Sequence, residues 1–259
     1  MKIAIFSDVH GNLTALEAVL VDIDRQSPDA IVFAGDLCLM GARPSACINL
    51  LQARKDILAI HGNTDLAIGQ PLTPPVDADE ATKTRYHEFN LKSEWTRAQL
   101  SDGEYAWLCD MPFSLRLSPT SSANDDLLIV HANPKDVDRP ILPPDEVQQQ
   151  RFGKVSQSQP DEELEPLLAD VTAAVIAYGH VHLPNIRQWR GMTLANISSV
   201  SIPMDADTRA KYGVLTWADG RWHISHYAIE YDLAAEQAII SQIQPPGWEW
   251  MAKSLLGRP

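Results

Sequence analysis

The chain has 259 residues, of which 45% are hydrophobic and 21% are charged, a balance typical of a globular protein with a sizeable core. Its 34 acidic and 21 basic side chains give a net charge of -13, which argues against broad binding to a nucleic-acid backbone. No window approaches eighteen uninterrupted apolar residues, so we expect no membrane span.

The first sixty residues alternate between short apolar runs and amphipathic segments. From Asn12, which can cap a helix, leucines recur at helical spacing, and Pro44 can open a second helix that continues through Lys55. Strands that alternate with helices predict right-handed crossovers and a parallel sheet. Three apolar runs are consistent with buried strands: 2–6, 30–34 and 56–60.

The middle of the chain has a different composition. Residues 71–83 are rich in proline and polar side chains, which is typical of a loop, and residues 84–108 then have a helical pattern. We therefore expect residues 66–110 to form a small helical cap inserted between sheet elements. The large apolar side chains that would anchor it are Phe89, Trp95, Leu100 and Trp107.

The second half returns to strand patterns. Residues 112–118 and 126–132 predict a hairpin with a long loop, and residues 136–170 predict one or two helices. The remaining expected elements are strands at 173–179 and 193–200, a hairpin of 212–217 and 222–229 closed by Asp219-Gly220, and a helix at 232–243. The tail after Gln244 gives no clear signal.

Polar side chains follow five of the predicted strands, at the point where each strand ends. Because ligands of α/β sheets bind beyond the carboxyl ends of strands, we expect these side chains to converge. Carboxylate, imidazole and amide groups together suit divalent metal ions. Seven ligands are too many for one tetrahedral site but fit two ions about 3.5–4 Å apart that share a carboxylate. The seven are Asp8, His10, Asp36, Asn63, His131, His180 and His182.

The ordered series resembles the motifs of the calcineurin-like metallophosphoesterases, and in particular their small bacterial phosphodiesterase branch. The matching motifs are Asp8-x-His10, Gly35-Asp36, Gly62-Asn63-x-Asp65, His131 and Gly179-His180-x-His182. This resemblance implies an α/β fold, a four-layer sandwich of two central mixed β-sheets flanked by helices. The whole chain, 1–259, would then be a single metallophosphoesterase domain, with residues 66–110 as its cap.

The resemblance also implies a mechanism, in which a hydroxide between the two metal ions attacks phosphorus in line. The catalytic residues would be Asp36, Asn63 and His131. Manganese is the metal that we expect, with iron, zinc or nickel as alternatives. The implied ligands are Asp8, His10 and His182 for one ion, Asn63, His131 and His180 for the other, and Asp36 as the bridge.

One position departs from the family pattern. Many members carry a histidine after the asparagine that can protonate the leaving group, whereas this chain has Thr64, a poor general acid. Losing such an acid costs roughly 10²–10⁴ in rate on poor leaving groups, so we expect a preference for good ones. Asp65 is expected to orient a ligand or to cap the following helix. The candidate substrate contacts are Asn12, Asn63 and Arg209.

The function predicted first is hydrolysis of a phosphodiester or nucleotide-type substrate, a small phosphorylated molecule. The alternatives are a phosphomonoesterase, a nuclease, which the acidic charge disfavours, and a non-catalytic scaffold of the same fold. The cysteines form no CxxC pair, so we expect buried, reduced thiols in a cytoplasmic protein. They are Cys38, Cys47 and Cys109.

Overall fold

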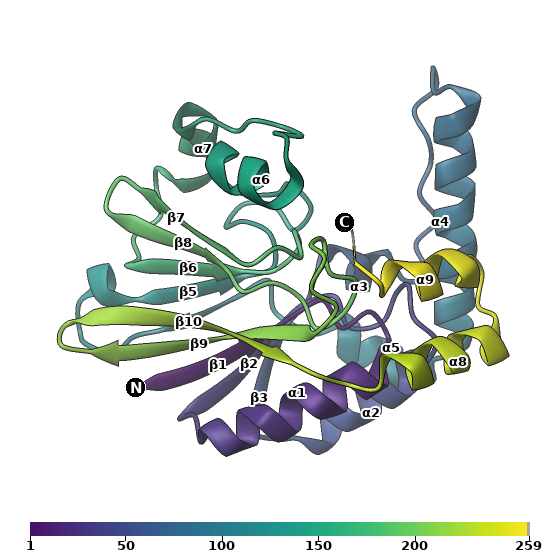
Figure 1. Ribbon diagram of the computed structural model, residues 1–259, viewed down its shortest axis with the longest axis horizontal. Helices are drawn as coiled ribbons and strands as arrows, with labels where there is room; N and C mark the ends of the chain where they lie inside the picture. Colours follow the sequence, from purple (N-terminus) through teal and green to yellow (C-terminus); the bar gives the residue numbers. More distant parts are fainter. Residues whose placement is uncertain (258–259) are drawn as a thin grey trace.

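Two five-stranded β-sheets lie face to face in this protein, with helices on their outer surfaces (Figure 1). The structure is a computed structural model, and it describes residues 1–257. The first sheet has the strand order β10-β9-β1-β2-β3. Strands β1, β2 and β3 are parallel, β9 pairs antiparallel with β1, and β10 pairs antiparallel with β9. Their bounds are Lys2–Phe6, Ala30–Ala34, Ile57–Ile60, Ala210–Ala218 and Arg221–Ile229.

The second sheet is also mixed and has the order β4-β5-β6-β8-β7. Strands β5, β6 and β8 are parallel, whereas β4 and β7 pair antiparallel at its two edges. The predicted class of two mixed sheets flanked by helices is therefore confirmed. The bounds of β4 to β8 are Ser114–Leu117, Leu127–Val130, Val175–Tyr178, Asn185–Trp189 and Met192–Asn196.

Alternation along the strands builds two kinds of core. In β1, Ile3 and Ile5 point between the sheets, whereas Ala4 and Phe6 pack against the outer helices. Both sheets are covered on both faces, which explains why their central strands read as continuous apolar runs rather than as alternating ones.

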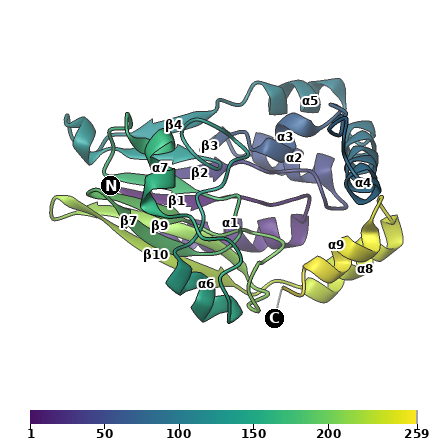
Figure 2. The same ribbon diagram turned by 90° about the horizontal axis from the view of Figure 1, so that it is seen from above.

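Helices form the two outer layers, which Figure 2 shows from above. Helices α1 (Leu13–Gln26) and α2 (Pro44–Ala53) pack on the first sheet, and α7 (Asp161–Leu168) packs on the second through Leu164 and Leu167. Helix α6 (Asp145–Phe152) lies beside α7 (Figure 1). Helix α2 ends at Ala53, two residues before the predicted end.

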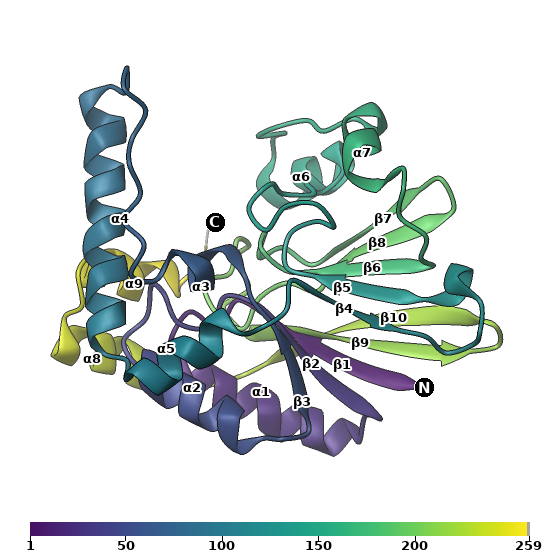
Figure 3. The ribbon, with the colours of Figure 1, turned by 180° about the vertical axis from the view of Figure 1, so that it is seen from behind.

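The helices in the region predicted as a cap differ in how they pack against the rest of the protein. Helix α3 (Asn63–Ala67) directly follows β3, α4 (Glu80–Ala98) begins inside the predicted loop, and α5 (Asp102–Cys109) starts at a capping box of Ser101 and Glu104. Helix α5 joins the core cluster of α1 and α2, so it belongs to the outer layer. Helix α4 instead rises from the body (Figures 1 and 3). Of the four expected anchors, Leu100 alone is buried.

The C-terminal tail, which the sequence left open, folds into a helix beside the strand ends. After α8 (Leu233–Ile243), which matches the predicted helix, the chain forms α9 (Trp248–Ser254). Met251 and Leu255 pack with Ile202 and Ala42 in a small separate cluster. This packing places α9 between α4 and the loops that follow the strands (Figure 1).

Strand β7 was not predicted, because its polarity pattern is inverted. Asn185, Arg187 and Trp189 are buried, whereas Ile186 is exposed. The buried guanidinium of Arg187 donates to the Asp161 carboxylate, which compensates for its desolvation. The pattern therefore lacks the apolar-in, polar-out alternation that identifies a half-buried strand.

Two further expectations concern membranes and thiols. Within residues 1–257, no helix combines the length and the apolar character needed to cross a bilayer. Cys38 and Cys47 are buried free thiols, as expected, but Cys109 is exposed at the end of α5, so the expectation of three buried cysteines is wrong for this residue.

Candidate metal centre and active site

The loops that follow β1, β2, β5 and β6 bring the predicted ligands together between the two sheets. His182 Nε2 lies 3.1 Å from an Asp8 carboxylate oxygen. Asp36 Oδ2 lies 3.4 Å from His131 Nε2 and 3.9 Å from His10 Nε2, so this carboxylate reaches both sides of the cluster. Two groups have ligand atoms within 4.8 Å of one another: Asp8, His10 and His182, and Asp8, Asp36 and His131.

Three of the histidines are oriented by the backbone. His10, His131 and His182 each direct Nδ1 at a carbonyl oxygen, at 2.9, 2.9 and 2.7 Å respectively. A carbonyl only accepts hydrogen bonds, so the proton of the neutral imidazole stays on Nδ1. Nε2 then carries a free lone pair that points into the cluster, which is the usual arrangement of a metal-binding histidine.

The atoms inside the cluster are acceptors that face one another. His10 Nε2 lies 3.3 Å from His182 Nε2, and the side-chain oxygen of Asn63 lies 3.0 Å from His131 Nε2. When the imidazoles are neutral, no proton lies between either pair, so each contact needs a positive charge, which is a proton on one ring or a metal ion. The donor set of imidazole, carboxylate and amide oxygen therefore fits divalent metal ions.

The pKa values of His131 and Asp36 also show that the site favours a positive charge. Burial lowers the pKa of His131, but the Asp36 carboxylate outweighs this and raises it to about 10. Burial likewise raises the pKa of Asp36, yet the neighbouring His131 and His10 hold it well below its usual range. The site therefore keeps its carboxylates ionised and favours a cation between them.

The backbone of the site is held in a sparsely populated conformation. Left-handed φ values are uncommon outside glycine and cluster at functional sites, where surrounding structure enforces them. Here they turn each side chain inward from the end of a strand. The residues are Asp8 (56°), His10 (48°), Asp36 (65°), His180 (63°) and His182 (56°).

A cavity of about 330 Å³ opens over these groups. Its floor is polar and includes Asp36, Asn63 and three of the histidines, whereas its walls are mostly apolar. Neither lysine nor arginine lines it within residues 1–257. An anion in this cavity would therefore depend on bound metal for charge compensation. The apolar walls are Met40, Pro140, Leu142, Val181, Ile202, Met204 and Trp250.

Comparison with known proteins identifies the family. The model of the calcineurin-like phosphoesterase superfamily domain matches residues 1–220, well over half of the chain. The chain belongs to the calcineurin-like phosphoesterase superfamily. The predicted family is thus confirmed, and this phosphoesterase carries all seven residues of the expected ligand series.

Individual relatives match this chain over nearly its full length. An uncharacterised protein of Methanocaldococcus jannaschii is 25% identical over 99% of this chain and 98% of its own. A metallophosphoesterase structure from Sphaerobacter thermophilus is 24% identical, with a TM-score of 0.68 and 98% of both chains covered. A hypothetical protein of Pyrococcus horikoshii has a TM-score of 0.75 at 16% identity, covering 98% of this chain and 97% of its own. The two structures share the fold of this phosphoesterase.

His180 and Asn63 lie at the edge of the cluster, beside His131. The His180 ring lies 5.1 Å from the His131 ring, centroid to centroid, and its backbone N–H donates to the Asp8 carboxylate at 3.0 Å. The Asn63 amide nitrogen donates to Asp138 at 2.9 Å, which turns its oxygen towards His131. The supporting role of Asp138 was missed, because the sequence gives no signal for it.

Two predicted substrate contacts lie elsewhere. Asn12 is buried, and its side chain accepts from Ala15 N–H at 3.0 Å and donates to Ser201 at 3.2 Å. Its amide therefore caps α1, as expected, and is not available to a substrate. Arg209 pairs with Asp207 at 2.7 Å and does not line the cavity. The structure gives neither residue a place at the site.

Asp65 contacts both the loop that carries Asp36 and the start of α3. Its buried carboxylate accepts hydrogen bonds from the backbone N–H groups of Asp36, Leu37 and Gly62, at 2.8, 2.8 and 2.9 Å. The first two contacts hold the loop after β2, and the third caps α3. Asp65 thereby fixes the position of Asp36.

Replacing Asp65 by asparagine should lower the free energy of unfolding by about 1–3 kcal/mol, the cost of leaving a buried donor unsatisfied. Whichever way the new amide turns, its NH₂ faces at least one backbone N–H. Urea unfolding of the metal-free protein measures the effect. Asp110→Asn, at an exposed position, is the control, and equal unfolding midpoints for the two variants would contradict this role.

Thr64, which follows Asn63 where the family resemblance implies a histidine, lies in the first turn of α3. The residue lines the cavity, but its hydroxyl oxygen is buried and has no hydrogen-bond partner among residues 1–257. Its backbone N–H donates to Asp36 at 2.9 Å. His61, the other imidazole near this loop, packs beside Phe113 and does not line the cavity.

Proposed function

We propose that this phosphoesterase hydrolyses phosphodiester or nucleotide-type substrates with two divalent metal ions. The observation that carries the proposal is the cluster of opposed acceptor atoms on the floor of the cavity. Asp8, His10 and His182 would hold one ion, His131, His180 and Asn63 the other, and Asp36 would contact both. Bound there, two cations supply a nucleophilic water at neutral pH and neutralise charge on phosphoryl oxygens.

The chain's own residues prepare this chemistry in three ways. Backbone carbonyls hold the histidine rings with Nε2 inward, and Asp65 holds the loop that carries Asp36. The apolar walls leave few polar side chains that could compete with the cluster for the reacting phosphate. Thr64 supplies a hydroxyl where an imidazole would supply a proton.

The leaving group should therefore decide the rate. Apart from the proposed ligands, no acidic or histidine side chain lines the cavity within residues 1–257. A poor leaving group would depart without a strong proton donor, which is slow. A nitrophenolate or a nucleoside phosphate needs little protonation, and such substrates should be favoured.

A substrate panel tests this function. We expect bis(p-nitrophenyl) phosphate or a dinucleoside polyphosphate to be hydrolysed with a higher kcat/KM than p-nitrophenyl phosphate. The monoester has the same leaving group as the first of these but carries a second negative charge on its phosphate, and neither lysine nor arginine lines the cavity within residues 1–257. The assay is run with Mn²⁺, Zn²⁺, Fe²⁺ and Ni²⁺ in turn, and with metal-depleted enzyme as the control. A monoester hydrolysed tenfold faster with every metal would favour a phosphomonoesterase, and no hydrolysis of any ester would favour a scaffold.

Manganese remains the metal that we propose, in a cytoplasmic protein. The mixed imidazole and oxygen ligands suit manganese but do not select it alone, since cellular supply also decides occupancy. The three thiols of this chain form no disulfide, which is typical of a reducing compartment. Metal analysis of freshly purified protein measures both the identity and the number of ions.

A further inference from the structure

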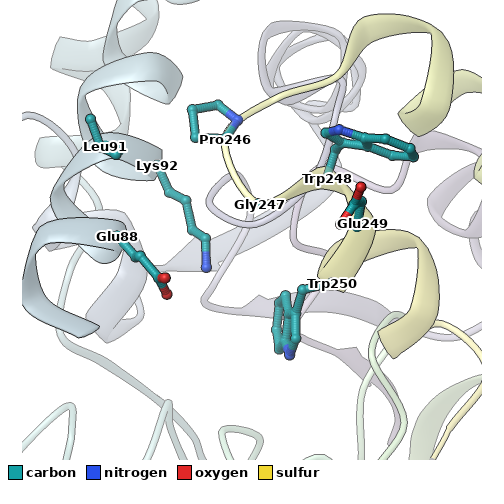
Figure 4. Close-up of a pocket in the computed structure, with 8 residues that line it drawn as sticks. All are labelled: Glu88, Leu91, Lys92, Pro246, Gly247, Trp248, Glu249 and Trp250. Atoms are coloured by element: carbon teal, nitrogen blue, oxygen red, sulfur yellow. The ribbon is translucent and has the colours of Figure 1, made fainter. Parts of the chain in front are cut away.

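A second cavity, of about 430 Å³, lies beside the metal-site cavity, between α4 and the start of α9. Figure 4 shows its side chains. The indole of Trp250 lines this cavity and the metal-site cavity alike, so the two spaces meet at one aromatic ring. The lining residues are Glu88, Leu91, Lys92, Pro246, Gly247, Trp248, Glu249 and Trp250.

Lys92 places a positive charge at this junction. Its ammonium lies 5.0 Å from the centre of the Trp250 ring, and the end of its aliphatic stem lies beside Gly247 (Figure 4). No carboxylate forms an ion pair with Lys92 within residues 1–257, although Glu88 and Glu249 line the same cavity. The ammonium is therefore available to an anionic group of a ligand.

Trp250 is both exposed and fixed. The residue is 44% exposed, which is high for a tryptophan, yet its neighbour Met251 is buried in the cluster that anchors α9. The indole thus projects from an anchored helix, and a base can stack on the face of the ring that Lys92 does not cover. Stacking of a base on such a face is favourable for any nucleobase, because every base has a π-face.

We propose that this cavity, called here the α4–α9 subsite, binds the nucleoside end of a nucleotide substrate whose scissile phosphate lies at the metal cluster. Trp250 stacks on the base, Lys92 contacts a phosphate beyond the scissile one, and Glu88 or Glu249 accepts from ribose hydroxyls. An indole, one cation and two carboxylates together match a nucleoside phosphate better than a simple anion. This inference rests on the proposed function and names its substrate class.

Kinetics on a long and a short substrate test the subsite. For diadenosine tetraphosphate, Trp250→Leu and Lys92→Gln should each raise KM about tenfold, the loss expected for one stacking or charged contact. The ratio of kcat/KM for this substrate to that for bis(p-nitrophenyl) phosphate should fall accordingly. Trp250→Phe should retain most of the ratio. Lys83→Gln, on the same helix but paired with Glu80, is the matched control.

Binding of ADP to EDTA-treated protein, measured by calorimetry, separates the two proposals. We expect the wild type and Lys83→Gln to bind ADP, and Trp250→Leu and Lys92→Gln to bind it about tenfold more weakly. If ADP binds in this way but no ester is hydrolysed, the proposed function fails and the subsite stands. If esters are hydrolysed but neither KM nor ADP affinity responds to Trp250→Leu and Lys92→Gln, the subsite is wrong. Thermal unfolding confirms that each variant is folded.

Discussion

Asp36→Asn should reduce turnover by about 10³-fold or more and lower the metal content of the purified protein. One carboxylate oxygen of Asp36 accepts from Thr64 N–H, and the other faces His131 and His10. An asparagine that keeps the first contact must point its NH₂ at the two histidines. The substitution therefore replaces a negative ligand by a hydrogen-bond donor at the place where both proposed ions meet.

The readouts for this variant are kcat on bis(p-nitrophenyl) phosphate and metal content by mass spectrometry. Asp207→Asn is the control, because Asp207 pairs with Arg209 and does not line the cavity. Thermal unfolding in EDTA distinguishes lost chemistry from lost folding. Full turnover with two ions bound in Asp36→Asn would remove the bridging role.

Gly179→Ala should abolish metal binding and lower the free energy of unfolding by about 1–3 kcal/mol, the usual cost of overpacking. A Cβ atom at this position would lie 2.2 Å from Ser7 Oγ and 2.3 Å from Asp8 Oδ2. Both distances are far inside van der Waals contact, so Asp8 or the loop before His180 must move. Either movement separates ligands that come from different sheets.

Gly103→Ala is the matched control, since a Cβ atom there meets nothing within 4 Å and the residue lies in α5. An added side chain in a helix should be neutral or slightly stabilising there. Metal titration and urea unfolding are measured for both variants. Wild-type metal affinity in Gly179→Ala would show that the close approach of this loop to Asp8 is not required.

The fold was predictable where apolar runs and turn residues agree. The first three strands and the hairpin at Asp219-Gly220, where both turn residues have positive φ, followed from local pattern. Strand β7 was not predictable, because its inward face carries Arg187, whose partner Asp161 is distant in sequence. The split of residues 80–109 into two helices depended on the capping box at Ser101, a signal that is present in the sequence but was overlooked.

The cluster of candidate ligands was predictable because each of these residues directly follows an apolar strand, and the order of the strands brings them to one edge. The substrate contacts were not, because they depend on packing between distant segments. The side chain of Asn12 caps α1, and Arg209 forms an ion pair with Asp207. Trp250 reaches the cavity only because α9 packs against Ile202 and Ala42, and no local pattern predicts that contact.

The place of β1 in the first sheet bears on how the protein forms during synthesis. This strand, made first, is flanked by β2 and by β9, which is not complete until residue 218. The last of the proposed metal ligands, His182, is likewise more than 170 residues after Asp8. A ribosome must therefore release most of the polypeptide before all seven proposed ligands can meet, so shorter translation products cannot hold the proposed pair of ions.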